Sequence, residues 1–272
     1  MNYIFNKTCI GYSHLKNKKP CQDFSASYKD NERTIITCCD GHGGSLYIRS
    51  DVGSKLASDA IITVFKSVDQ KFLRDYETNL LDQIKLLVLC EYNRLVESAL
   101  AKKPIRKWEC KGLSDDDIER LRLTPVKAYG TTLSGAMIYR NKCFVISIGD
   151  TETLAFKDCN LIKLFDNSDD PAGNITYSMC QEDAYQYMRM TIFDFKDVDG
   201  VLLCTDGMSS PYQSYVNFNN AFVKPVISKI LKTKSISSIE EHVNHVALQL
   251  GVGDDVSLSF ILSDKAKYKY YL

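Results

Sequence analysis

The sequence has no long apolar run and no excess of charge of either sign. No segment approaches the roughly 18 consecutive apolar residues of a transmembrane helix. Lys and Arg (34) balance Asp and Glu (34), so the formal net charge at pH 7 is zero. A neutral chain does not indicate a nucleic-acid-binding or membrane-binding surface, and we expect neither partner. Any phosphate that the protein handles must therefore be met by local charge.

Cysteine spacing and histidine content exclude the common zinc and disulfide frameworks. The ten cysteines are scattered, mostly within apolar runs, and none forms a Cys-x-x-Cys pair. None of the four histidines stands at zinc-ligand spacing from a cysteine. The first 20 residues have neither the apolar core nor the cleavage site of a secretory leader. We therefore expect free, buried thiols and a cytoplasmic protein.

Length and composition predict one globular unit. The chain has 272 residues, of which 44% are hydrophobic and 25% are charged, which is ordinary for a globular protein. No repeat, linker or low-complexity segment divides it. We expect a single domain over residues 1–272, acting as a monomer.

The hydrophobic pattern alternates between two periods along the chain. Residues 2–28 read as a pair of strands joined by a Lys-rich loop, and strand patterns return at 34–39 and repeatedly between 131 and 165. Four-residue spacing predicts helices from about 45 onward, over about 80–100, over about 216–232, and from 237 or 238. Further strands are expected at 188–195, 201–205 and 256–262. The segment 101–128 reads as a surface excursion with at most one short helix, and 166–187 as a loop over a sheet edge.

This order of elements predicts an α+β fold. Short strands joined by tight turns are typical of antiparallel sheets, and the helices come in two separate groups. The simplest arrangement is a central antiparallel β-sandwich flanked by α-helices on both sides.

Carboxylates stand at the ends of several of these expected strands. The apolar run 34–39 stops at Asp40-Gly41-His42-Gly43-Gly44, similar runs end near Asp150 and Asp206, and Asp254 stands just before the run 256–262. Any single Asp-Gly is most often a structural turn. Several acidic strand ends together are less easily explained, because clustered buried carboxylates repel one another. A pair of divalent cations removes that cost, and oxygen ligands without nearby Cys or His favour Mg²⁺ or Mn²⁺ over Zn²⁺.

The acidic strings appear in a recognisable order and context. Taken together, they resemble the metal-dependent protein phosphatases, the type 2C serine/threonine phosphatases, and the compact form resembles the bacterial members. The resemblance spans positions 22 to 262. Its motifs are Gln22-Asp23, Asp40-Gly41-His42-Gly43-Gly44, Gly130-Thr131-Thr132-Leu133, Gly149-Asp150, Thr205-Asp206-Gly207 and Asp254-Asp255.

The resemblance implies a fold, a reaction and a set of site residues. The implied fold is a four-layer αββα sandwich with two divalent ions at one end. The implied reaction is hydrolysis of phosphoserine or phosphothreonine by a metal-bridged water of lowered pKa, without a covalent intermediate, and with His42 protonating the leaving oxygen. Asp150 would belong to a weaker third metal position. The implied ligands of the two main ions are Asp40, the Gly41 carbonyl, Asp206, Asp254 and, largely through water, Asp23.

The chain departs from the family pattern at three places. Gln22 stands where Glu is frequent, and Ser210 stands where an Asp commonly supports the third metal, which weakens the case for that ion. The family's phosphate-binding Arg falls on Lys18, a point charge without the bidentate fork of Arg. His14 and Lys19 are close enough in sequence to compete with Lys18 for the phosphate.

Three functions follow as hypotheses. The first is a Mg²⁺- or Mn²⁺-dependent phosphatase of phosphorylated proteins. The second, kept open by Gln22 and Ser210, is a pseudophosphatase that acts as a binding module. The third is a phosphatase of small phosphorylated metabolites, which a lidded pocket would favour.

Overall fold

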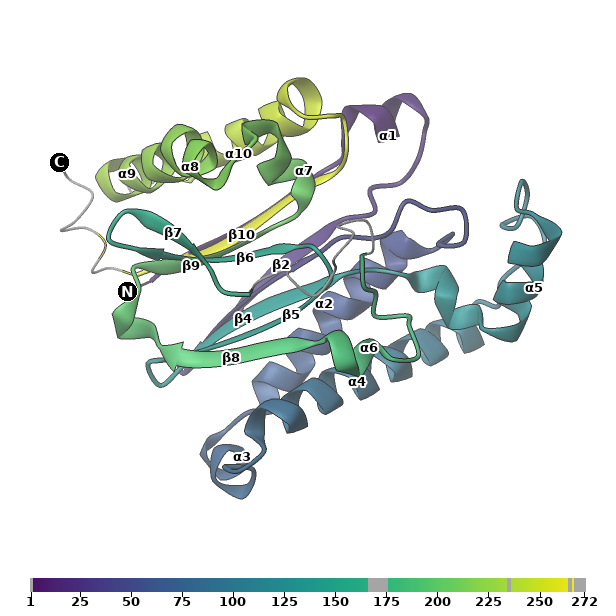
Figure 1. Ribbon diagram of the computed structural model, residues 1–272, viewed down its shortest axis with the longest axis horizontal. Helices are drawn as coiled ribbons and strands as arrows, with labels where there is room; N and C mark the ends of the chain where they lie inside the picture. The colour runs from purple at the N-terminus through teal and green to yellow at the C-terminus, as the bar shows by residue number, and fades with distance from the viewer. Residues whose placement is uncertain (1, 166–175, 234–235, 264–265, 267–272) are drawn as a thin grey trace.

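Two antiparallel sheets pack face to face at the centre of the protein (Figure 1). The computed structural model describes residues 2–165, 176–233, 236–263 and 266. One sheet has the strand order β1-β10-β9-β6-β7 and the other β2-β3-β4-β5-β8. The strands are β1 (Tyr3–Cys9), β2 (Phe24–Lys29), β3 (Arg33–Cys39), β4 (Leu133–Tyr139), β5 (Lys142–Ile148), β6 (Glu152–Lys157), β7 (Asn160–Lys163), β8 (Arg189–Asp194), β9 (Gly200–Cys204) and β10 (Val256–Leu262).

Helices cover the outer face of each sheet, so the predicted sandwich with helices on both sides is confirmed (Figure 1). Helices α2 and α4 lie on the sheet that contains β3, and helices α8 to α10 lie on the sheet that contains β10. The α-helices are α1 (Tyr12–Lys16), α2 (Ser50–Ser67), α3 (Gln70–Asp75), α4 (Leu80–Lys102), α5 (Asp115–Leu123), α6 (Ala184–Tyr187), α7 (Asp206–Ser209), α8 (Tyr215–Phe218), α9 (Lys224–Thr233) and α10 (Ser237–His245).

Shorter helical turns complete these layers. Three are 3₁₀ turns and two are π-helical continuations of neighbouring α-helices. They are η1 (Pro125–Tyr129), η2 (Phe195–Asp197), η3 (Ser210–Tyr212), η4 (Asn219–Val223) and η5 (Val246–Leu250).

Three apolar clusters hold the four layers together. The cluster between the two sheets includes Ile36, Val145 and Leu203, all fully buried. A second cluster joins α2 and α4 to one sheet, and a third joins the C-terminal helices to the other. Alternation explains this arrangement, because successive residues of a strand point to opposite faces and both faces are covered. Ile35 and Ile36, adjacent on β3, accordingly belong to different clusters.

The N-terminal strands do not form the expected pair. Strand β1 pairs with β10, as in Phe5 opposite Phe260, whereas β2 pairs with β3 in the other sheet. The connection between β1 and β2 holds helix α1 and carries the chain from one layer to the next. Such a connection is too long to fix a hairpin register, so pairing is decided by distant strands.

The helix expected from about 45 begins instead at Ser50. Residues 45–49 form turns, with the Tyr47 amide donating to the Gly44 carbonyl at 3.0 Å. Helix α4 matches the expected range, and α3 between the two was not predicted. The excursion at 101–128 contains one α-helix, α5, as expected, followed by the turn η1.

Part of the expected loop at 166–187 lies outside the described residues, namely 166–175. Its described end forms the short helix α6 beside β8 (Figure 1). Among the helices that the structure describes, none combines the length and the apolar character needed to cross a bilayer. The structure describes all ten cysteines; none of them forms a disulfide, and five are buried.

Candidate active site

The sheet register brings the acidic strand ends to one end of the sandwich. Asp23 immediately precedes β2 and Asp40 immediately follows β3, and the pairing of Phe24 with Cys39 sets them side by side. In the other sheet Asp206 follows β9 and Asp254 precedes β10, which are antiparallel neighbours. Asp150 follows β5 at the same end. Five carboxylates from distant segments therefore lie at the same end of the sandwich.

Their mutual repulsion is visible in their pKa values. Burial raises the pKa of Asp23 well above its usual range, and Asp255, Asp254 and Asp206 raise it further. The pKa of Asp40 is likewise raised by burial and then by its acidic neighbours, Asp23 first. Burial also raises the pKa of Asp206, although this side chain lies at the rim where solvent reaches it. The carboxylates thus run from the interior out to the surface.

The donor set fits hard divalent cations. In the part of the chain that the structure describes, these carboxylates have no ion pair with Lys or Arg to offset their charge. Among the same residues, no three His, Cys, Asp or Glu side chains lie close enough together to hold an ion. The repulsion that raises the pKa values of the carboxylates acts over longer distances than a coordination bond. It is therefore consistent with carboxylates that are too far apart to share an ion. Carboxylate and carbonyl oxygens in need of positive charge suit Mg²⁺ or Mn²⁺.

The loop after Asp40 is held by the threonines of the 130–132 string. The Thr132 hydroxyl accepts a hydrogen bond from the Asp40 amide at 2.8 Å, and the Thr131 hydroxyl donates to the Asp40 carbonyl at 2.8 Å. Gly41 forms an isolated bridge with Thr131. A Cβ at Gly41 would lie 2.5 Å from the Gln22 carbonyl oxygen, so only glycine fits there. These contacts explain why the two motifs, far apart in sequence, occur together.

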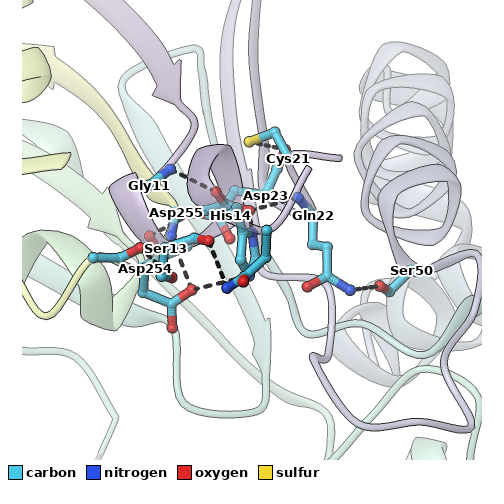
Figure 2. Close-up of polar contacts among 12 residues, drawn as sticks. Gly11, Ser13, His14, Cys21, Gln22, Asp23, Ser50, Asp254 and Asp255 are labelled. Carbon is cyan, nitrogen blue, oxygen red and sulfur yellow. Dashed lines mark hydrogen bonds and ion pairs between the residues drawn. The ribbon is translucent and has the colours of Figure 1, made fainter. Parts of the chain in front are cut away.

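A buried carboxylate that sequence reasoning did not assign, Asp255, organises the N-terminal side of the site (Figure 2). It accepts hydrogen bonds from the backbone amides of Gly11 at 2.8 Å and Gln22 at 2.6 Å. His14 Nδ1 also lies 2.8 Å from the Asp255 carboxylate. In the sequence, the feature that could have pointed to Asp255 is the Asp-Asp pair at 254–255. Asp254, the other member of the pair, is half exposed.

Gln22 and Asp23 are fixed by hydrogen bonds to other parts of the site. The side-chain amide of Gln22 donates to the His42 carbonyl at 3.1 Å. It also donates to the Ser50 hydroxyl (Figure 2). The Thr205 hydroxyl donates to the Asp23 carboxylate at 2.8 Å. Gln22 therefore supports the loop that carries His42.

His42 is held with one ring nitrogen available. Its backbone amide donates to the Gly130 carbonyl at 3.1 Å, and its ring packs 4.9 Å from the Tyr47 ring. Its buried Nε2 has no hydrogen-bond partner among the described residues. Burial lowers the pKa of this imidazole, an effect partly opposed by the Asp150 charge.

The three basic candidates lie in different environments. His14 is buried against Asp255, and its Nε2 lies 3.9 Å from Asp254. Lys18 and Lys19 are exposed in the loop before Asp23, and Lys18 has a left-handed backbone with φ 54°. A flexible exposed lysine can approach an incoming anion, whereas His14 is already engaged.

The sequence profile of the family described as "Protein phosphatase 2C" matches residues 10–244. The chain belongs to the protein phosphatase 2C family. The family and the enzyme class predicted from the acidic motifs, a phosphoprotein phosphatase, are therefore confirmed. A search of curated protein sequences finds no match.

Solved structures of bacterial protein phosphatases share the fold of this protein phosphatase 2C chain. The S. agalactiae serine/threonine phosphatase is 15% identical, with a TM-score of 0.63 over 97% of this chain and 100% of that one. Staphylococcus aureus Stp1 is 16% identical, with a TM-score of 0.60 over 97% and 96% of the two chains. The catalytic domain of PstP, solved with 2 manganese ions, is 16% identical, with a TM-score of 0.59 over 96% and 97%.

In this phosphatase the loop that carries His42 is also anchored by Arg49. The Arg49 guanidinium makes a bidentate ion pair with Glu109, at 2.8 and 3.0 Å. It also donates to the Tyr129 hydroxyl at 2.6 Å and to the Lys103 and Pro104 carbonyls. The side chains of Arg49 and Glu109 are only 6% and 10% exposed. The start of α2 is thereby tied to the excursion at 101–128.

Replacing Arg49 with Met should destabilise the phosphatase by about 3–5 kcal/mol, because Glu109 would remain buried without its partner. Urea unfolding measures the effect. The matched control is Arg94→Met, which breaks an exposed bidentate pair with Glu91 and should cost less than about 1 kcal/mol. Equal losses for the two variants would mean that burial of the Arg49 network contributes nothing to stability.

Proposed function

We propose that the protein is a Mn²⁺- or Mg²⁺-dependent phosphatase of phosphoserine and phosphothreonine in proteins. The observation that carries the proposal is the presence of five carboxylates at one end of the sandwich, without a lysine or arginine ion pair among the described residues, together with a histidine whose Nε2 has no hydrogen-bond partner there. Phosphoryl transfer needs positioning and positive charge rather than a protein nucleophile. Both requirements are supplied if cations occupy the acidic cluster.

The proposed ligands divide between two main ions and a weaker third. Asp40 and the Gly41 carbonyl are proposed as ligands of the main ions, and the hydrogen bonds of Thr131 and Thr132 to Asp40 support this by fixing their loop. Bound divalent ions would activate water for attack and neutralise charge on the phosphoryl oxygens. Asp150, whose carboxylate accepts a hydrogen bond from Thr176, is proposed for the third position. The remaining proposed ligands are Asp206, Asp254 and, at the buried end of the cluster, Asp23.

His42 is proposed as the general acid. A group that protonates a leaving alkoxide must present an N–H toward the substrate and change protonation near neutral pH. The Nε2 of His42 has no partner in the described structure and is therefore available for this task. Its backbone is fixed by Gly130, and its carbonyl by Gln22, so the ring is positioned before substrate arrives.

We propose that Lys18, assisted by Lys19, meets the phosphate. Both are exposed and adjoin the Asp23 segment, so a mobile cation would approach from the solvent side. His14 competes less well, because its Nδ1 is bound to Asp255 at 2.8 Å. Its proposed role is to hold the loop of Lys18 and Lys19 through the Asp255 contact.

A pseudophosphatase remains the second candidate, favoured by the loose spacing of the carboxylates and by Gln22 and Ser210. Calorimetric titration with Mn²⁺ and hydrolysis of a phosphothreonine peptide separate the two. The enzyme should bind Mn²⁺ and gain about 2.7 kcal/mol of stability at a metal concentration of 100 Kd. It should also release phosphate, and excess EDTA should stop the release. Metal uptake without hydrolysis, or no uptake at all, would contradict the enzymatic proposal.

The remaining expectations accompany this proposal. The protein would act as one catalytic domain over residues 1–272, as a monomer in the cytoplasm, on phosphorylated protein substrates. Small phosphorylated metabolites are the alternative substrates, and comparison of kcat/KM for peptides and metabolites distinguishes them.

A further inference from the structure

The excursion between α4 and η1 is attached to the catalytic end of the sandwich. Besides the Arg49–Glu109 pair, the Ser45 hydroxyl donates to the Asp117 carboxylate of α5 at 3.4 Å. Ser45 directly follows the glycines of the loop that carries His42. Figure 1 shows α5 at the end of the molecule where α1 also lies. A protein chain bound at the active site would therefore pass close to this excursion.

A groove of about 530 Å³ opens in the surface of the excursion, and we call it the excursion groove. Its apolar lining residues include Ile105, Ile118 and Leu121, and we call them the floor. Leu121 is 3% exposed, whereas Ile118 on the same helix is 39% exposed. The floor is therefore anchored in the packed interior by Leu121, while Ile118 leaves apolar surface open to solvent. Exposed apolar surface of this kind is typical of sites that bind partners.

The charged lining residues of the excursion groove, which we call its rim, are all basic. Arg106, Lys107 and Arg122 line it, and no acidic residue does. Arg122 is paired with Glu119 at 2.9 Å. Arg106 and Lys107 are exposed, and in the described chain neither side chain has an ion pair. Two uncompensated cations beside an apolar floor form a local feature on a chain whose net charge is zero.

A second hollow is lined in part by the excursion and in part by the loop before Asp23. It has a volume of about 530 Å³ and extends between Pro20 and Trp108. Pro20 adjoins Lys19, and Trp108 adjoins Lys107 on the rim of the excursion groove. Trp108 is 69% exposed and is the single tryptophan of the chain. The lining of this hollow thus includes a sequence neighbour of the proposed phosphate-binding loop and a sequence neighbour of the excursion groove, together with the acidic residues Asp51 and Glu109.

We infer that the excursion groove binds a segment of the protein substrate, outside its phosphorylated residue, in which apolar side chains are flanked by carboxylates. The inference rests on the proposed function. The apolar side chains would bury the floor, and the carboxylates would face Arg106 and Lys107. The groove would thereby select among phosphoproteins that the phosphate site alone cannot distinguish.

The binding test does not depend on catalysis. Trp108 fluorescence is followed while an unphosphorylated peptide with apolar residues flanked by Glu is added to the intact protein. A saturable change is expected, weakened about tenfold for the same peptide with Gln in place of Glu. The double variant R106E/K107E should lose affinity by at least a similar factor. A titration without a saturable change in the wild-type protein would overturn the inference.

The catalytic test uses paired substrates. Phosphopeptides with the acidic-apolar segment at several distances on either side of the phosphothreonine are compared with versions that carry Ser and Gly instead. R106E/K107E and Ile118→Ser should raise KM for the best segment-bearing peptide with little change in kcat. Their activity on p-nitrophenyl phosphate should equal that of the wild type. Loss of p-nitrophenyl phosphate activity in these variants would mean that the groove supports the active site and does not dock substrate.

A matched control and an oligomerisation assay complete the test. The variant K229E/K232E makes the same charge change in α9, on the opposite helical layer, and should behave as wild type (Figure 1). An equal rise in KM for this control would assign the effect to overall charge and overturn the inference. A wild-type dimer that R106E/K107E dissociates would identify a second copy of the chain as the occupant and would also overturn it. Absence of hydrolysis for every substrate would refute the proposed function alone, since peptide binding is measured separately.

Discussion

Asp40→Asn is expected to lower the hydrolysis of a phosphothreonine peptide by at least about a thousandfold, which corresponds to about 4 kcal/mol of transition-state stabilisation. The charges of Asp23, Asp206, Asp150 and Asp254 all act on Asp40. An amide at this position keeps the shape of the side chain and removes its charge. The measurement is kcat/KM in excess Mn²⁺, with the EDTA-treated wild type as the reference for complete loss.

Unfolding of the variant would also abolish activity. The raised pKa of Asp40 predicts instead that Asp40→Asn stabilises the metal-free fold. Its pKa in the folded, metal-free protein is raised, so the folded state binds more protons than the unfolded state above the ordinary pKa of an aspartate. The ionised carboxylate therefore destabilises the fold as pH rises through this window toward neutrality. Metal-free Asp40→Asn should melt at a higher temperature than metal-free wild type at pH 7.

Two comparisons make this prediction specific. Mn²⁺ should raise the melting temperature of the wild type and have a much smaller effect on Asp40→Asn. Asp51→Asn, a change of the same kind in the first turn of α2, should leave both activity and metal response unchanged. Retention of more than about a tenth of wild-type activity by Asp40→Asn would be incompatible with a central role for this carboxylate.

His42→Gln is expected to slow hydrolysis of the phosphothreonine peptide by about 10²–10⁴-fold, the usual contribution of a general acid. The effect should depend on the leaving group. A peptide alkoxide requires a proton as it departs, whereas the oxygen of p-nitrophenyl phosphate departs as a stable anion. The variant should therefore retain most of its activity toward p-nitrophenyl phosphate. Parallel kcat measurements on the two substrates test this difference.

The control and the pH profile address the same histidine. His245→Gln alters an exposed histidine of α10 and should leave both rates unchanged. Because burial lowers the pKa of His42, its protonated form is lost at a lower pH than for an ordinary imidazole. The peptide rate should therefore carry a deprotonation step below the ordinary pKa of about 6.5 that His42→Gln abolishes. Equal losses on both substrates would exclude His42 as the proton donor.

The acidic cluster could be anticipated because strand ends are readable from sequence. Each apolar run that stops at Asp places a carboxylate at a sheet edge, and antiparallel pairing brings alternate ends together. Asp40 follows β3 directly and Asp206 follows β9 after one residue, so their positions needed only the correct strand boundaries. The layered fold followed from the same boundaries together with the two groups of helices. The roles assigned to the individual carboxylates remain predictions.

The supporting contacts could not be read in the same way. In the sequence His14 reads as a candidate for phosphate binding, yet helix α1 turns it inward onto Asp255. Asp254 and Asp255 are adjacent and chemically identical, and only the strand register decides which of them is buried. Arg49 likewise meets Glu109 across 60 positions of sequence, and local pattern carries no information about such a partner.

Strand β10 lies between β1 and β9 and is preceded directly by Asp254 and Asp255. During synthesis the ribosome therefore makes the N-terminal strand long before its neighbour in the sheet exists. Until residues up to about 262 have left the exit tunnel, β1 has no partner and the Gly11 amide has no carboxylate to meet. A nascent or prematurely terminated chain would consequently be unable to remove phosphate from other proteins, and activity would begin only after translation had passed the last strand.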